Sequence, residues 1–256
     1  MGGWEPTDEA VRYAYGLAFR LIGDEDAAGD LAQESLLSAW KARETLADDA
    51  SGRPWLRRIV VNAFLMKARS ARVMRETEFP DEDPTPYADI SYAPPDAALE
   101  TDEAIRSIRN GCFFAMARNL TPEQRCAFVL ADMVGLAAAE AASLMAVGTA
   151  AYRGLLHRAR ANINAFFGDH CSVVRPSNPC TCTAWSRLVA DREALRAAVA
   201  ARGGPPPFAD PEYAKRGDIA TAPAVLSLFR SIPDRLPPPA WFERTGAALA
   251  GLRSAG

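Results

Sequence analysis

Apolar residues recur every three to four positions over most of this chain, and that spacing restricts it to helical folds. Within residues 7–75, the first such stripe consists of Val11, Tyr15, Ala18, Phe19 and Ile22. The chain shows no β-rich stretch and no internal repeat. We therefore predict an all-α fold.

Turn and capping residues divide residues 7–75 into three predicted helices. Gly23-Asp24 ends the first helix, and Asp26 or a neighbour begins the second. The buried side of the second helix carries Leu31, Leu36, Leu37 and Trp40. A polar loop is expected at 45–53, and Pro54 suits the first turn of a helix over 55–75. The core face of that helix is predicted to carry Leu56, Ile59, Val60, Ala63 and Phe64.

A change in composition separates two helical domains. Residues 76–100 hold five prolines among many acidic residues, so an acidic, extended, proline-rich linker is expected over 76–102. A second helical domain follows at 103–167. Thr121-Pro122-Glu123-Gln124 is a strong helix start, and Gly135 ends that helix. A short helix at 138–145, a turn at 146–148 and a longer helix from near Thr149 complete the domain.

Residues 168–256 form a C-terminal extension with a different character. A cysteine-containing segment precedes one amphipathic helix at 185–201, and a Gly/Pro run breaks the chain at 203–207. Two short helices are expected at 222–231 and 239–252. The apolar residues of this extension predict that it packs on another surface, for which the two helical domains are candidates. They include Leu188, Leu195, Leu226, Phe229, Trp241 and Phe242.

Charge and hydropathy limit the partners and the compartment. The formal net charge is −3, so nucleic acid can be attracted only by local basic patches. No apolar run approaches the roughly 20 residues of a membrane-spanning helix, and the N-terminus lacks the pattern of a signal peptide. The cytoplasm is the expected compartment, where thiols stay reduced or bind metal.

Two neighbouring segments carry unusual polar patterns. Helical spacing puts Asp30, Gln33 and Glu34 on one side of the second helix. Six basic residues and no acid occur between Arg57 and Arg75, which suits phosphate contacts, and Asn62 on the buried side can bond a base edge. Either pattern alone is more often a solvated surface.

Together the two segments resemble conserved region 2 of bacterial sigma factors, in which D-L-x-Q-E-x-[FL]-x-x-x-W is followed by W-L-x-x-I-x-x-N. The resemblance implies that Asp30, Gln33 and Glu34 bind the coiled coil of the polymerase's large subunit. It also implies that the loop before Trp55 and the helix after it hold the melted −10 element. Asn62 and Leu46 would line the protein pocket that holds a base flipped out of this element. The basic residues assigned to the DNA strand are Arg57, Arg58, Lys67 and Arg69.

The segment 120–163 is similar to sigma region 4, which has L-[PT]-x-x-x-R-x-x-F-x-L, a helix-turn-helix and L-H-R-A-R. The second helix of such a motif enters the major groove. By this resemblance Arg153 faces the −35 element, and phosphates or polymerase are contacted by His157, Arg158 and Arg160. At positions where polar side chains of such a helix often contact bases, this chain has small residues, so we predict weak direct recognition of the base sequence. They are Gly148, Ala150, Ala151 and Gly154.

The two resemblances imply a sigma factor of the extracytoplasmic-function class. Its expected partners are core RNA polymerase and promoter DNA, with an anti-sigma factor as a further candidate and no membrane. An enzyme is disfavoured because the chain has two histidines, no nucleophile motif and no glycine-rich phosphate loop. The alternative is a helix-turn-helix regulator that works without polymerase, but it leaves the pattern at residues 30–40 unexplained.

A cluster of soft metal ligands follows the second domain. It consists of His170, Cys171, Cys180 and Cys182. Three thiolates and an imidazole can bind zinc, and thiolates also suit copper(I), whereas the alternative is free cysteines in a reducing compartment. No cofactor is required for sigma activity, so zinc is an expectation for the extension only. A metal there would let the tail cover a polymerase- or DNA-binding face and act as an anti-sigma factor in cis.

Overall fold

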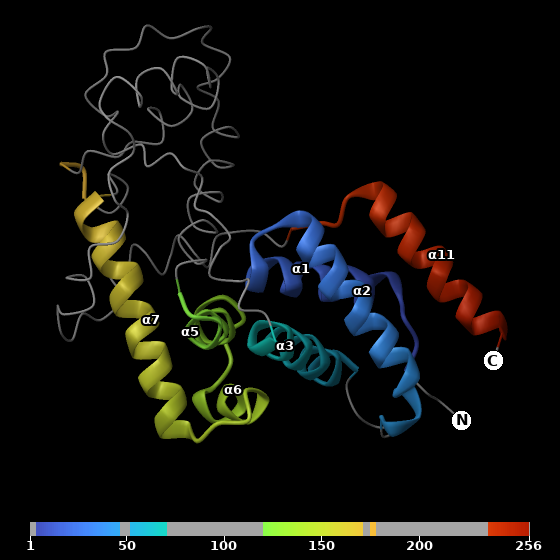
Figure 1. Cartoon of the computed structure of the whole chain (residues 1–256), viewed down its shortest axis with the longest axis horizontal. Helices are drawn as coiled ribbons and strands as arrows, with labels where there is room; N and C mark the ends of the chain where they lie inside the picture. Colours follow the sequence, from blue (N-terminus) through green and yellow to red (C-terminus); the bar gives the residue numbers. More distant parts are fainter. Residues whose placement is uncertain (1–3, 47–51, 71–119, 171–174, 178–234, 256) are drawn as a thin grey trace, which may run out of the picture. The chain divides into compact units, whose positions relative to one another are not determined.

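The structure is a computed structural model, which describes residues 4–46, 52–70, 120–170, 175–177 and 235–255. Within these residues the chain forms helices and turns and no strand, which confirms the predicted all-α class (Figure 1). Two compact units are present: one combines Met1–Met74, Thr121–Arg153 and Pro233–Gly256, and the other combines Arg75–Leu120 and Gly154–Ile232. None of the described helices is long and apolar enough to cross a membrane.

The first helix ends, and the second begins, at the residues that their sequence signals predict. Thr7 caps α1 (Asp8–Ile22) and Asp24 caps α2 (Glu25–Lys41), each accepting a hydrogen bond from the backbone N–H three residues on, at 3.2 and 2.9 Å. Between them, Gly23 has a φ of 75° and its N–H donates to the Phe19 carbonyl. The expected stripe on α1 is buried.

The third helix differs from its prediction in two ways. After the short helix η1 (Arg43–Thr45), α3 (Gly52–Ser70) includes Gly52 and Arg53, which the sequence had assigned to a loop. Val61 and Leu65 are buried, whereas Ile59 and Ala63 are only half-buried. The reason is that α3 packs against α5 (Pro122–Phe128) and α6 (Ala138–Leu144) as well as against α1 and α2.

The second motif starts with a well-formed cap and contains one element that was not predicted. Thr121 and Gln124 exchange two 3.2 Å hydrogen bonds in a capping box at the start of α5. The next turn, η5 (Val129–Met133), is a π-helix, and it ends just before Gly135, whose φ is 81°. The short helix α6 and the start of α7 (Thr149–His170) lie where they were predicted.

Ala146, in the turn after α6, has a φ of 53° and is the one non-glycine residue with positive φ among those described. Its side chain makes that conformation cost roughly 1–2 kcal/mol. We expect Ala146→Gly to raise the free energy of unfolding by about 0.5 kcal/mol. The gain is smaller than the strain removed, because glycine also increases the conformational entropy of the unfolded chain. Thermal melting measures the effect. The exposed α6 residue Ala139 supplies the control, since Ala139→Gly should destabilise by about 1 kcal/mol. Equal losses in both variants would contradict the prediction.

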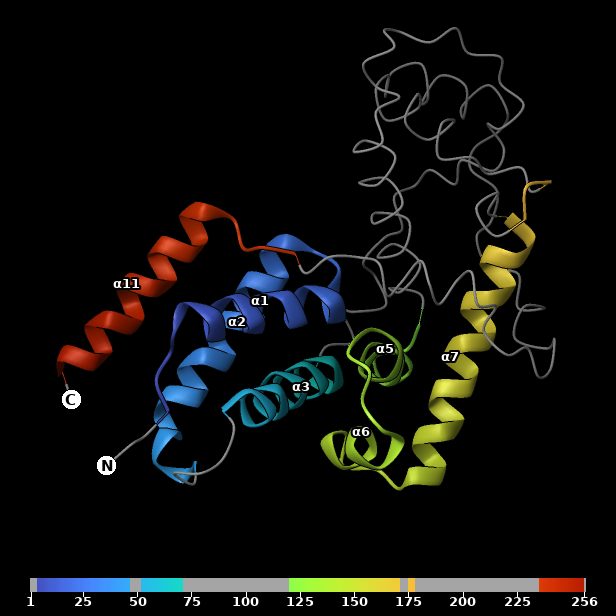
Figure 2. The same ribbon diagram turned by 180° about the vertical axis from the view of Figure 1, so that it is seen from behind.

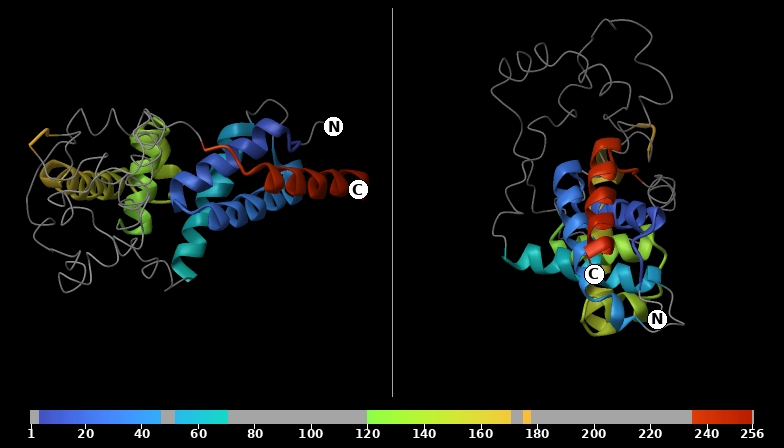
Figure 3. Two further views of the ribbon diagram at one scale, coloured as in Figure 1. Left: turned by 90° about the horizontal axis from the view of Figure 1, so that it is seen from above. Right: turned by 90° about the vertical axis from the view of Figure 1, so that its right-hand side faces the viewer.

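The C-terminal helix lies against the N-terminal helices. α11 (Pro239–Ala255) is three residues longer than the predicted helix at 239–252 and lies alongside α1 and α2 (Figures 1 and 2). Views from above and from the side keep these helices together (Figure 3). The prediction that the extension packs on the helical domains is thus confirmed for Trp241 and Phe242. The helices expected at 185–201 and 222–231 lie outside the described residues.

Candidate functional site

The three residues predicted to bind polymerase form an exposed row on α2. Asp30, Gln33 and Glu34 are all exposed, at the spacing of one helix turn. The opposite side of α2 is buried, and the one hydroxyl there, that of Ser35, donates to the Leu31 carbonyl at 2.7 Å. The buried side of α2 is therefore packed and its hydroxyl is hydrogen-bonded, while the opposite side exposes two carboxylates and one amide to solvent.

A basic face with one exposed amide side chain runs along α3. Arg58, Asn62 and Arg69 are exposed on it, and Lys67 is exposed beside it. The sequence had put Asn62 on the buried side of the helix, and that placement was wrong, because the buried side instead includes Val61 and Leu65. Met66 lies in the same row and is 68% exposed, an unusual position for a large apolar side chain. The face combines positive charge, an amide and an apolar group.

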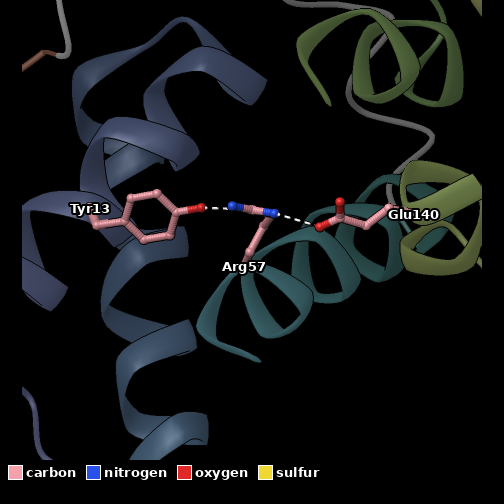
Figure 4. A network of polar contacts seen from close by, with 3 residues as sticks. All are labelled: Tyr13, Arg57 and Glu140. Carbon is pink, nitrogen blue, oxygen red and sulfur yellow. Dashed lines mark hydrogen bonds and ion pairs between the residues drawn. The ribbon is translucent and has the colours of Figure 1, made fainter. Parts of the chain in front are cut away.

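Arg57, a member of the predicted strand-binding set, has two partners on other helices. Its Nε donates to the Tyr13 hydroxyl and its Nη1 donates to Glu140 Oε1, both at 2.9 Å (Figure 4). Tyr13 comes from α1 and Glu140 from α6. The Arg57 side chain is 11% exposed and that of Glu140 is 49% exposed, so water reaches the ion pair from the Glu140 side. Sequence reasoning missed both partners, since no local pattern marks a contact between residues so far apart.

Leu46, assigned to the pocket of the flipped base, lies half-buried just after η1. A Cβ on Gly52 would lie 2.9 Å from Trp4 and 4.0 Å from Leu46, so these side chains crowd the start of α3. Asn62 lies ten residues further along that helix, about 15 Å by its rise. The described residues therefore do not bring Leu46 and Asn62 together, and residues 47–51 of the intervening loop lie outside them.

The candidate −35 residues follow one another along α7. Arg153, His157 and Arg158 are exposed and Arg160 is half-buried. At the start of the helix Tyr152 is fully buried, and its hydroxyl donates to the Ala127 carbonyl at 3.1 Å. This bond fixes the first turn of α7 to α5.

Two arginine contacts, one buried and one part-buried, were also missed. Arg125, which is 2% exposed, donates from Nη1 to the Leu21 carbonyl in the last turn of α1 at 3.1 Å. Arg20 donates from Nη1 to the Met133 carbonyl at 3.4 Å. The family pattern marked the position of Arg125 but not its partner. These bonds join α5 and η5 to α1.

The metal prediction is not addressed by the described residues. His170 ends α7, whereas Cys171, Cys180 and Cys182 lie outside them. In the part of the chain that the structure describes, no group of three His, Cys, Asp or Glu side chains could hold a metal ion. Cys126 is buried, and burial raises the pKa of its thiol, so it stays protonated and unsuited to metal binding.

Comparison with protein families matches two parts of the chain. Residues 8–73 match the family model described as Sigma-70 region 2, and residues 111–163 match the model described as Sigma-70, region 4. The first match contains the exposed row on α2 and the basic face of α3. The second contains α5, η5 and α6 and the first part of α7.

The curated relatives that the chain matches include several ECF RNA polymerase sigma factors. The chain is 32% identical over 173 residues to the ECF RNA polymerase sigma factor SigG of Mycobacterium tuberculosis, covering 62% of this chain and 45% of the relative. It is 30% identical over 176 residues to SigE of Mycolicibacterium smegmatis, covering 66% and 65%. SigJ of Mycobacterium tuberculosis is 35% identical over 161 residues, covering 61% and 49%. The chain therefore spans about half the length of the curated relatives it matches.

Proposed function

We propose that this chain, which belongs to the extracytoplasmic-function class of the sigma-70 family, directs core RNA polymerase to specific promoters and opens them. The observation that carries the proposal is the row Asp30, Gln33 and Glu34, exposed together on a helix whose other side is core. A row of this kind suits a basic or polar partner surface. The proposal gives the chain no catalytic step, since the polymerase supplies the chemistry.

In this proposal the basic face of α3 holds the melted −10 strand, and α7 contacts the −35 element. Phosphates would be neutralised by the arginines and lysine of α3, while Asn62 bonds a base edge. Arg57 is paired with Glu140, and a phosphate would need the same guanidinium. Strand binding through Arg57 would therefore compete with the Arg57–Glu140 ion pair, which links α3 to α6.

Reconstituted transcription tests the proposal. The full chain is mixed with core polymerase from its source organism and genomic DNA fragments, and transcript 5′ ends are mapped. We expect new start sites that core polymerase alone does not produce, and poor promoter binding by the chain alone. Tight DNA binding without polymerase, together with no new transcripts, would instead support a helix-turn-helix regulator.

Asn62→Ala is expected to weaken promoter opening. The amide is exposed on α3, where it can reach a base, and a good base contact contributes about 1–3 kcal/mol. Open-complex formation should therefore fall by roughly 5- to 150-fold, which permanganate reactivity of unpaired thymines measures. Met66→Ala, one turn further along the same face, is the matched control, because a thioether reads no base edge. An equal loss in both variants, or normal melting with Asn62→Ala, would remove Asn62 from the site.

A further inference from the structure

The C-terminal helix α11 docks on the region 2 helices through a regular stripe. Pro237, Thr245 and Leu249 are buried and Trp241 is half-buried, at four-residue spacing along one side of the segment. The Trp241 ring lies 5.1 Å from that of Tyr15 on α1. This helix lies outside both segments that match the sigma models, so it is an addition to the two modules.

The docking site on α2 depends on a glycine. A Cβ on Gly29 would lie 2.7 Å from Nε1 of Trp241, closer than real Cβ atoms approach, and 3.1 Å from Cδ1. Glycine is the least favourable residue inside a helix apart from proline. Its presence in the second turn of α2 lets the indole of Trp241 lie directly on the helix backbone.

Charged side chains hold the docked helix at its N-terminal end. The guanidinium of Arg12 lies 4.9 Å from the centre of the Phe242 ring. Just before α11, Arg235 forms an ion pair with Glu25 and lies 5.7 Å from the Phe19 ring. Arg12 belongs to α1, and the partners of Arg235 belong to α2 and α1. Residues of region 2 therefore contact both Phe242 and a residue that precedes α11.

The docked state also contains an unfavourable feature. The Tyr15 hydroxyl is fully buried beside Trp241 and has no hydrogen-bond partner. A buried polar group without a partner opposes the state that buries it. Undocking of α11 would uncover the Tyr15 ring and give the hydroxyl access to water. The contact thus combines ring packing with an unpaired buried hydroxyl, which lowers the free-energy cost of releasing α11.

We propose that α11 is an intramolecular ligand of the groove between α1 and α2, and that it competes with core RNA polymerase for region 2. The inference rests on the proposed function. Gly29 and Gln33 are one turn apart on the same side of α2, so Trp241 lies next to the polymerase row. A helix with its side chains is about 10 Å wide, so a two-helix coiled coil seated on Gln33 would extend over the position of α11.

Gly29→Ala separates docking from the stability of region 2. The added methyl group collides with the Trp241 ring, whereas alanine is a better helix former than glycine, so α2 itself is not weakened. Trp241→Ala removes the same contact from the other partner. Gly246→Ala is the matched control: it is the same change on α11, where a Cβ would meet nothing within 4 Å.

Hydrogen exchange of the α11 amides in the full chain measures docking, and titration with core polymerase measures competition. We expect slow exchange of α11 in the wild type and in Gly246→Ala, and faster exchange in Gly29→Ala and Trp241→Ala. Saturating core polymerase should accelerate exchange of α11 in the wild type. If α11 is docked in roughly nine molecules of ten, both releasing variants should bind polymerase about tenfold more tightly.

Each outcome decides between the alternatives. If α11 stays protected when polymerase is bound, or if the releasing variants bind polymerase no better than the wild type, α11 is only a structural support and the proposal is wrong. If no variant and no wild-type chain binds polymerase, the proposed function fails instead. Hydrogen exchange without polymerase would then still report whether α11 docks.

Discussion

A chain that carries both Asp30→Lys and Glu34→Lys is expected to lose binding to core RNA polymerase. Both carboxylates are exposed on α2, one helix turn apart, so the double change turns an acidic row into a basic one. Juxtaposing like charges at an interface costs several kcal/mol, which corresponds to a loss of at least about 100-fold in affinity. Fluorescence anisotropy of the labelled chain titrated with core polymerase measures it.

The folded state should survive this change, because lysine is a good helix former and the core side of α2 is untouched. Glu5→Lys with Glu9→Lys is the matched control: two exposed carboxylates four residues apart near the start of α1 are reversed in the same way. The control should bind polymerase within about twofold of the wild type at moderate salt. If the two double variants bind equally well, α2 does not dock the polymerase.

Local signals in the sequence predicted most of the helix boundaries. Gly23 ends α1 in the left-handed conformation that glycine favours, and Thr121 caps α5 with Gln124, both as expected. These features depend on neighbouring residues only. The apolar residues that the spacing assigned to the core of α1 are all buried, although Ala14, Leu17 and Leu21 outside that stripe are buried as well.

The errors arise where distant segments meet. α3 packs on two sides, so its buried face is wider than a single stripe, and the side of Asn62 was misjudged. Two contacts join segments that are far apart in the chain: the ion pair between Arg57 and Glu140, and the packing of Trp241 against Gly29. Nothing in the local sequence around a helix glycine or around a tryptophan of the tail indicates that the two are in contact. The π-helix at 129–133 was missed because it shifts the periodicity by one residue within a single turn.

Arg125 is expected to be the side chain whose loss most destabilises the junction between α5 and α1. It is 2% exposed and donates to the Leu21 carbonyl, one of the last carbonyls of α1, which lack partners within their own helix. In Arg125→Ala the charged hydrogen bond and the packing of the side-chain stem are both lost, and the carbonyl stays buried. The expected cost is about 3 kcal/mol of unfolding free energy.

Thermal unfolding followed by circular dichroism measures this cost, with a fall in the midpoint of roughly 6–12 °C for a chain of this size. Arg125→Lys keeps the charge and most of the apolar stem, so it should recover part of the loss, whereas Arg125→Met keeps the stem alone and should recover less. Because Arg125 lies away from the exposed row on α2, Arg125→Ala should still bind core polymerase at a temperature where it remains folded. A midpoint within 1–2 °C of the wild type would show that the Leu21 carbonyl finds another partner and that this bond contributes little to the junction.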